Sequence, residues 1–186
     1  TRLRDLSAER DKARAGERSA IRLANSDPLT GLLNRRAFLD LAIGRDQPHR
    51  LLLVDIDRFK AINDRVGHDI GDEVLCAVAR LLQDLRPPES LAVRLGGEEF
   101  ALLVPLARMQ DCAPERILET VRQHAMPFGI RATVSLGFAD GWVTTADDWK
   151  RLYRLADSAL YRAKADGRNR ACRATDFTTA PAAASA

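Results

Sequence analysis

The sequence lacks the features of membrane-spanning and disulfide-stabilised proteins. Its 186 residues contain no apolar run near the roughly 20 residues that span a bilayer, and no charged, apolar and small-residue leader. It has only three cysteines, spaced for neither a disulfide framework nor a zinc site. We therefore expect a soluble, cytoplasmic domain that makes no membrane contact itself. Membrane attachment of a longer protein, through a preceding segment, stays open.

Most of the chain also lacks an excess of either charge. Residues 1–26 hold seven Lys or Arg and four Asp or Glu, which accounts for the whole net charge of +3. Of the 29 basic and 26 acidic residues, this leaves 22 of each sign in the rest of the chain. Nucleic-acid-binding proteins usually carry a broad basic surface. The balance argues against a nucleic-acid partner.

The first 26 residues differ in character from those that follow. Apolar residues there recur at helical spacings, interrupted by charge, at Leu3, Leu6, Ala13, Ala20 and Ala24. This spacing outlines a weak coiled-coil helix, with a solvated single helix or a disordered end as alternatives. Asp27-Pro28 ends the helix. We divide the chain into a helical stub at 1–26, a domain at 27–174 and a low-complexity, disordered tail at 175–186.

Helical and strand patterns alternate through residues 27–174, as in mixed α/β domains. Their periodicity predicts helices over residues 34–43, 59–66, 70–85, 112–125 and 147–166. The apolar run 51–54 predicts a buried strand, and alternation over 130–138 predicts a half-buried one. Two further strands, 91–95 and 100–104, flank Gly96-Gly97 and predict a hairpin.

Carboxylates gather at two places that this arrangement can bring together. Asp55 and Asp57 follow the first strand, whereas Glu98 and Glu99 lie at the hairpin tip. If the hairpin joins the sheet of the first strand, Asp55 and Glu98 form an acidic edge. Its hard oxygens suit Mg²⁺ shared with the phosphates of a substrate. The alternative is an ordinary polar loop, because strand ends and hairpin tips often carry such residues.

Basic and amide side chains near these carboxylates could bind a nucleotide. Lys60 follows Asp55 within one helical turn, and Lys164 and Arg168 share one face at the end of the last helix. They could hold a triphosphate, or simply complement a helix dipole. Asn63 and Asp72 have the groups that read a guanine edge, although capping and turn formation are their usual roles.

Four blocks of sequence together resemble one family. Residues 94–100, RLGGEEF, resemble the signature of the GGDEF family of diguanylate cyclases in its variant with Glu at the third position. DPLTGLLNR at 27–35, DIDRFKAIND at 55–64 with GHDIGD at 67–72, and the closing helix and loop at 156–169 resemble the other family blocks. They occur in the family's order and spacing, over about residues 27–173.

The resemblance implies an α+β fold with a mainly antiparallel central sheet wrapped by helices, similar to the core of nucleotidyl cyclases and polymerase palms. It implies that two GTP molecules become cyclic di-GMP and two pyrophosphates in a homodimer, with Mg²⁺ or Mn²⁺ as cofactor. It also implies an upstream sensor domain outside this sequence. The alternatives are a catalytically silent GTP-binding regulatory module and a structural dimerisation domain.

The resemblance also implies roles for individual residues. The metal ligands would be the carboxylates of Asp55 and Glu98, the Ile56 carbonyl and Glu99. Guanine would be read by Asn63 and Asp72. The phosphates would be held by Lys60, Lys164, Arg168 and backbone N–H groups near Arg58 and Phe59. Glu98 would help to deprotonate the attacking ribose 3′-OH, and Lys60 would join it in catalysis.

Two features of the sequence bear on inhibition and specificity. The family's product-inhibition site is an Arg-x-x-Asp pair, and the matching positions here are Pro87 and Ser90. Arg86 and Glu89 offer a similar pair one residue early, so we expect weak or absent inhibition by product. A related subgroup that makes mixed cyclic dinucleotides has Ser where this chain has Asp72, and Asp72 therefore favours guanine over adenine.

Overall fold

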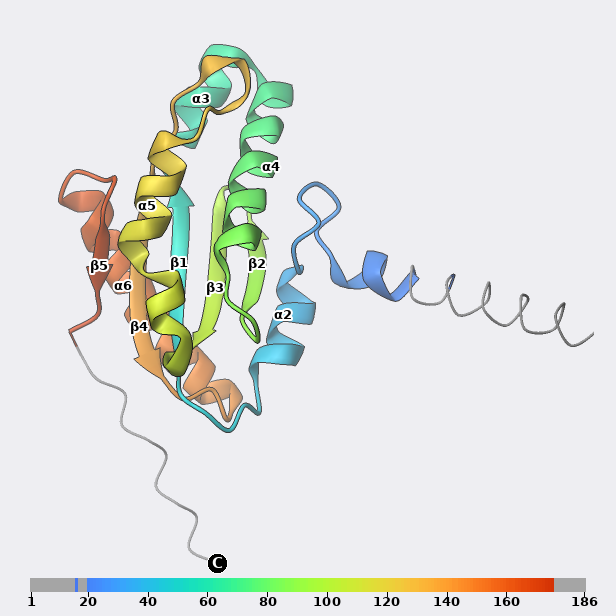
Figure 1. Ribbon diagram of the computed structural model, residues 1–186, viewed down its shortest axis with the longest axis vertical. Helices are drawn as coiled ribbons and strands as arrows, with labels where there is room; N and C mark the ends of the chain where they lie inside the picture. The colour runs from blue at the N-terminus through green and yellow to red at the C-terminus, as the bar shows by residue number, and fades with distance from the viewer. Residues whose placement is uncertain (1–15, 17–19, 176–186) are drawn as a thin grey trace, which may run out of the picture.

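One five-stranded sheet organises the molecule. The computed structural model describes residue 16 and residues 20–175. The strand order is β2-β3-β1-β4-β5, with every neighbouring pair antiparallel except β4 and β5. Helices cover both faces of the sheet, as Figure 1 shows. The expected α+β fold with a mainly antiparallel sheet is confirmed.

The elements follow the predicted pattern closely. The strands are β1 (His49–Ile56), β2 (Leu91–Gly96), β3 (Glu99–Pro105), β4 (Val134–Gly141) and β5 (Ala171–Arg173). The α-helices after residue 34 are α2 (Arg35–Ala42), α3 (Phe59–Val66), α4 (His68–Leu85), α5 (Pro114–Gln123) and α6 (Ala146–Ala165). Two 3₁₀ helices, η1 (Leu106–Cys112) and η2 (Pro127–Gly129), complete the order. Residues 20–25 are also helical.

The central strand β1 supplies both halves of the core. Because side chains alternate across a strand, Leu52 and Val54 face α4 and α5, whereas Leu51 and Leu53 face α2 and α6. Figure 1 shows α4 and α5 on one side of the sheet and α6 on the other. All four side chains are at most 2% exposed. This double cover fixes the position of the end of β1, where Asp55 lies.

The prediction of a half-buried strand over 130–138 is wrong in its bounds and its burial. The strand β4 begins at Val134, and all eight of its residues are buried. The cause is the close approach of α6, since a Cβ atom at Gly137 would lie 2.1 Å from the backbone nitrogen of Leu160. Gly137 therefore faces a helix, and Ser135 is bonded to Asp57, so neither faces solvent.

The helix expected over 112–125 is shorter than predicted. Cys112 closes η1, and α5 begins at Pro114, whose fixed φ suits the first turn of a helix. Most of the predicted stub and nearly all of the predicted tail lie outside the described residues. Within the described part of the chain, none of the helices has the length and apolarity needed to cross a bilayer.

Candidate active site

The condition for an acidic edge is met, because the hairpin joins the sheet beside β1. In the antiparallel register of β1 and β3, Asp55 lies opposite Glu99. The Ile56 amide donates to the Glu98 carbonyl at 3.4 Å. Glu98 therefore occupies the turn directly beside the end of β1. Ile56 itself is fully buried, which fixes the backbone between Asp55 and Asp57.

Asp55 is a buried carboxylate paired with a lysine from α6. The Lys164 Nζ atom lies 2.7 Å from Asp55 Oδ2, and the Asp55 side chain is 8% exposed. Burial raises the pKa of Asp55, and although the hydrogen bond and charge of Lys164 oppose that rise, the negative charges of Glu98 and Glu99 add to it. A cation placed here would relieve the cost of the buried negative charge.

The two glutamates of the hairpin have different surroundings. Glu99 lines a small cleft with Tyr153 and Asp157 of α6. Burial raises the pKa of Tyr153, and the Glu99 and Asp157 charges raise it further. The predicted ligand Glu99 thus lies on the face of the sheet that α6 covers, whereas Glu98 lies at the turn itself.

The donor set near Asp55 fits a metal shared with a substrate. The described residues contain no group of three or more His, Cys, Asp or Glu side chains able to enclose an ion. Mg²⁺ is usually bound through one or two carboxylates together with substrate phosphates. Asp55 and Glu98 supply two carboxylates from separate strand ends, and the missing oxygens would come from the substrate.

The two predicted guanine-binding residues come together where α3 meets α4. Asn63 packs directly on Gly71, since a Cβ atom at Gly71 would lie 1.8 Å from Asn63 Oδ1. Asp72 follows Gly71 and is exposed. Asn63 Oδ1 is buried and has no hydrogen-bond partner. The glycine therefore leaves the space in which the Asn63 amide is held.

The first turn of α3 lacks a cap. Arg58 occupies the N-cap position in a left-handed conformation, with φ 54°, and no side chain caps the helix. Uncapped N–H groups and the helix dipole favour an anion at such a position. Phe59 is buried and anchors the turn, whereas Lys60 is exposed beside it. The predicted phosphate-binding N–H groups and Lys60 thus lie together at the start of α3.

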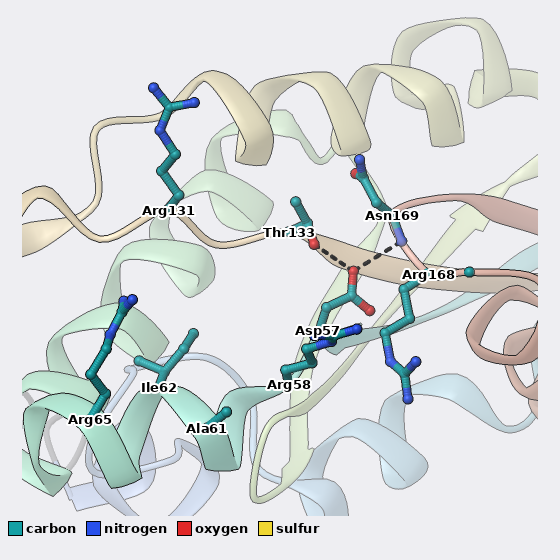
Figure 2. Close-up of a pocket in the computed structure, with 10 residues that line it drawn as sticks. Asp57, Arg58, Ala61, Ile62, Arg65, Arg131, Thr133, Arg168 and Asn169 are labelled. Atoms are coloured by element: carbon teal, nitrogen blue, oxygen red, sulfur yellow. Dashed lines mark hydrogen bonds between the residues drawn. The ribbon is translucent and has the colours of Figure 1, made fainter.

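Asp57 is a structural anchor that the sequence alone did not reveal. Its carboxylate accepts hydrogen bonds from the Thr133 hydroxyl at 2.6 Å and from the backbone amide of Asn169 at 3.0 Å, as Figure 2 shows. It also accepts a hydrogen bond from the Ser135 hydroxyl at 2.6 Å. These bonds join the end of β1 to β4 and to the loop after α6. They fix that loop beside α3, and the same loop carries Arg168, which lines one cavity with Arg58.

A second unpredicted contact holds the hairpin turn. The Arg94 guanidinium donates to the Gly97 carbonyl at 2.8 and 3.0 Å, and to Asp27 Oδ1 at 3.2 Å. Asp27 in turn accepts from the backbone and hydroxyl of Thr30. The Asn34 side chain, which caps α2, also donates to the Ala24 carbonyl at the end of the N-terminal helix. These contacts connect that helix to the glutamate turn.

The positions of the product-inhibition pair are occupied by other interactions. Pro87 and Ser90 are buried, and the Ser90 hydroxyl has no partner. The Arg86 guanidinium donates to the Ser90 carbonyl at 2.9 Å. Glu89 is exposed and has a left-handed φ of 67°. The expectation of weak product inhibition stays a prediction.

The fold and the site define a class: an α+β domain with an acidic strand edge, an uncapped helix start and nearby cations. The family model described as diguanylate cyclase, GGDEF domain, matches residues 24–170. The chain therefore belongs to the GGDEF family.

Relatives agree with this assignment. The diguanylate cyclase DgcM of Escherichia coli K12 is 44% identical over 160 residues, which cover 79% of this chain and 38% of the relative. The coiled coil and GGDEF domain of DgcB from Caulobacter crescentus, solved with c-di-GMP, has a TM-score of 0.73 and 33% identity, covering 93% of this chain and 97% of that one.

A third relative has the same variant of the signature. It is the active GGEEF domain of a diguanylate cyclase from Vibrio cholerae, with a TM-score of 0.62 and 35% identity, covering 70% of this chain and 85% of that one. This chain spans between 35% and 50% of the length of the curated relatives it matches.

Proposed function

We propose that this chain is the catalytic domain of a diguanylate cyclase, which condenses two GTP molecules into cyclic di-GMP and two pyrophosphates. The observation that carries the proposal is the pairing of β3 with β1, which places Glu98 beside the buried Asp55–Lys164 pair. Burial disfavours the charged form of Asp55. A carboxylate in such surroundings is typical of a functional site and is not needed in a purely structural domain.

Each of the surrounding residues has a role in binding GTP. Asp72 accepts from the guanine N–H groups, and the Asn63 amide donates to a guanine acceptor. The uncapped N–H groups near Arg58 and Phe59 receive the phosphates. The triphosphate is neutralised by three cations: Lys60 on α3, Lys164 on α6 and Arg168 in the loop after α6. These contacts orient the α-phosphate toward the acidic edge.

The chemical step needs an activated 3′-OH and a stabilised leaving group. Asp55 and Glu98, with the Ile56 carbonyl and Glu99 nearby, would hold Mg²⁺ or Mn²⁺. When bound, these ions would supply Lewis-acid polarisation of the phosphate and stabilise the developing negative charge. Glu98 accepts the proton of the attacking ribose 3′-OH. Lys60 and Lys164 stabilise the negative charge that develops on the leaving pyrophosphate.

Ring closure requires two copies of the site. One chain presents one GTP and one 3′-OH, so two domains must face each other in a symmetric dimer. The hydrogen bond from the Asn34 side chain to the Ala24 carbonyl ties the end of the helical segment at residues 20–25 to the domain. A pairing of two such helices would bring the sites together under the control of an upstream sensor domain.

The decisive experiment measures GTP turnover with Mg²⁺ over a range of protein concentrations, with products separated by chromatography. The wild type is compared with Glu98→Gln, which keeps the size of the side chain and removes its charge, and with Glu115→Gln, an exposed glutamate on α5. We expect cyclic di-GMP to rise steeply with concentration. Glu98→Gln should lower the rate about a hundredfold or more, and Glu115→Gln should not change it.

The other outcomes separate the alternatives. GTP binding without turnover at any concentration, even after fusion to a strong dimerisation helix, would establish a silent GTP-binding module. No GTP binding with a dimer still present would point to a structural dimerisation domain. Turnover that Glu98→Gln leaves intact would refute the role assigned to Glu98.

Product inhibition is expected to be weak, because Arg86 is bonded to the Ser90 carbonyl and neither Pro87 nor Ser90 offers a charged group. Cyclic di-GMP added at micromolar concentrations should change the initial rate by less than about twofold. The rate of Arg86→Gln should respond to cyclic di-GMP in the same way as that of the wild type. Strong inhibition that Arg86→Gln abolishes would show that the shifted pair with Glu89 binds product.

A further inference from the structure

A cavity of about 440 Å³ opens beside the proposed phosphate site, among α3, the segment before β4 and the loop after α6. This volume lies in the usual range of small-molecule sites, about 300–1,000 Å³. Four arginines line the cavity: Arg58, Arg65, Arg131 and Arg168. Figure 2 shows Arg65 and Arg131 on one side and Arg168 on the other, with Thr133 and Asp57 between.

The wall of this cavity is electropositive. Within residues 20–175, none of the four arginines forms an ion pair with an acidic side chain. The one carboxylate in the wall belongs to Asp57, and it already accepts hydrogen bonds from Thr133, Ser135 and Asn169. Guanidinium groups without a partner bind phosphate oxygens in bidentate geometry, so the cavity favours a phosphate-bearing anion.

The four arginines divide into two pairs by position. Arg58 and Arg168 border the proposed phosphate site, at the start of α3 and in the loop that Asp57 anchors. Arg65 lies in the last turn of α3 and Arg131 in the segment before β4, and both are exposed. This second pair has no role in the GTP contacts proposed above. The two pairs line the same cavity.

We propose that the side of this cavity formed by Arg65 and Arg131 is a separate anion subsite, which takes the pyrophosphate released in the reaction. The identity of the anion rests on the proposed cyclase activity. Pyrophosphate is compact and highly charged, which suits a cavity lined by four guanidinium groups. The subsite lowers the chance that the product rebinds at the acidic edge.

The test measures the affinity of the intact chain for inorganic pyrophosphate by calorimetry, in the absence of GTP. The wild type is compared with the double variant Arg65→Gln/Arg131→Gln. The matched control is Arg80→Gln/Arg108→Gln, which removes two exposed arginines on α4 and η1. We expect the first variant to bind pyrophosphate about tenfold or more weakly, and the control to bind it within about twofold of the wild type.

A second readout uses turnover. The concentration of added pyrophosphate that halves the rate should rise about tenfold in Arg65→Gln/Arg131→Gln, while the KM for GTP stays within about twofold. Equal weakening in both double variants would reveal a general charge effect and overturn the subsite. So would unchanged binding in Arg65→Gln/Arg131→Gln.

Failure of this inference is distinguishable from failure of the cyclase proposal. A chain that makes no cyclic di-GMP but binds pyrophosphate through Arg65 and Arg131 would refute the cyclase activity and retain the anion subsite. A chain that turns over GTP but binds pyrophosphate without these two arginines would refute only the subsite.

Discussion

Single side chains in this site depend on the space that their neighbours leave. Asn63 occupies the place where any residue larger than glycine at position 71 would put its Cβ atom. Burial raises the pKa of Asp55, and the hydrogen bond and charge of Lys164 oppose that rise. The contact of Asn63 with Gly71 and that of Asp55 with Lys164 can therefore each be tested by a single substitution.

Gly71→Ala is expected to weaken GTP binding about tenfold without lowering stability. The new methyl group would displace the flexible Asn63 amide, while alanine in the helix interior stabilises α4 by up to about 1 kcal/mol. Nucleotide titration and urea unfolding measure the two effects. In an Asn63→Ala background, Gly71→Ala should cost no further affinity. Additive losses would show that Gly71 acts independently of Asn63.

At the scale of the elements, contacts between segments far apart in the sequence hold the hairpin and the last helix. Arg94 joins the turn after β2 to Asp27, and both side chains are mostly buried, at 14% and 19% exposed. Gly137 allows α6 to approach β4 closely enough for Lys164 to reach Asp55. The positions of the acidic turn and of α6 therefore depend on one ion pair and one glycine.

Arg94→Gln is expected to reduce kcat about tenfold while changing the KM for GTP by less than about threefold, because the turn that carries Glu98 loses its support. The free energy of unfolding should fall by about 1–3 kcal/mol, since Asp27 loses a partner. Steady-state kinetics and urea unfolding test this. In a double-mutant cycle with Asp27→Asn, the combined loss should be smaller than the sum. An unchanged kcat would contradict the proposed support of the turn by Arg94.

Gly137→Ala is expected to destabilise the domain by about 1–3 kcal/mol, because the added methyl group meets the backbone of Ala156 and Leu160. Backbone atoms cannot rotate away as a side chain does, so α6 must shift. Urea unfolding measures the loss, with Ala132→Gly as a comparison at a buried position before β4. Unchanged stability in Gly137→Ala would mean that α6 moves away from the sheet at little cost.

At the scale of the whole molecule, the double cover of the sheet buries a histidine at the start of its central strand. His49 is fully buried, and its Nδ1 atom lies 2.7 Å from the Gln47 carbonyl oxygen. Burial lowers its pKa and the Arg45 charge lowers it further, against opposing effects of Gln47 and Asp46. Folding therefore favours the neutral imidazole, which couples the stability of the fold to pH.

The wild type should lose stability as the pH falls below the ordinary histidine value of 6.5, because the unfolded chain then binds a proton that folded His49 resists. This contribution is present above 6.5 and declines until the pH reaches the lowered pKa. Urea unfolding at about pH 7.5 and about pH 5.5 should show a smaller decrease for His49→Gln than for the wild type. Equal decreases would refute the linkage to His49.

The sequence by itself determined the blocks of site residues and most of the elements, but not β5, the 3₁₀ helices or the start of β4. Short-range signals were sufficient for this, since apolar periodicity marked α3 and β1, and Gly96-Gly97 marked the hairpin. The sequence predicted that Glu98 lies beside Asp55 if the hairpin pairs with β1. The structure confirms that pairing. The family resemblance rested on the same local blocks, and the family match agrees with it.

Only the tertiary structure decided how distant segments meet. Asp57 and Asn169 are 112 residues apart, and Asp27 and Arg94 are 67 apart, so no local pattern links them. The burial of both faces of β4 and the gathering of Arg65 and Arg131 at one cavity are also products of packing. Periodicity reports which side of an element is apolar, but the partner of each polar side chain is chosen by the three-dimensional arrangement of the elements.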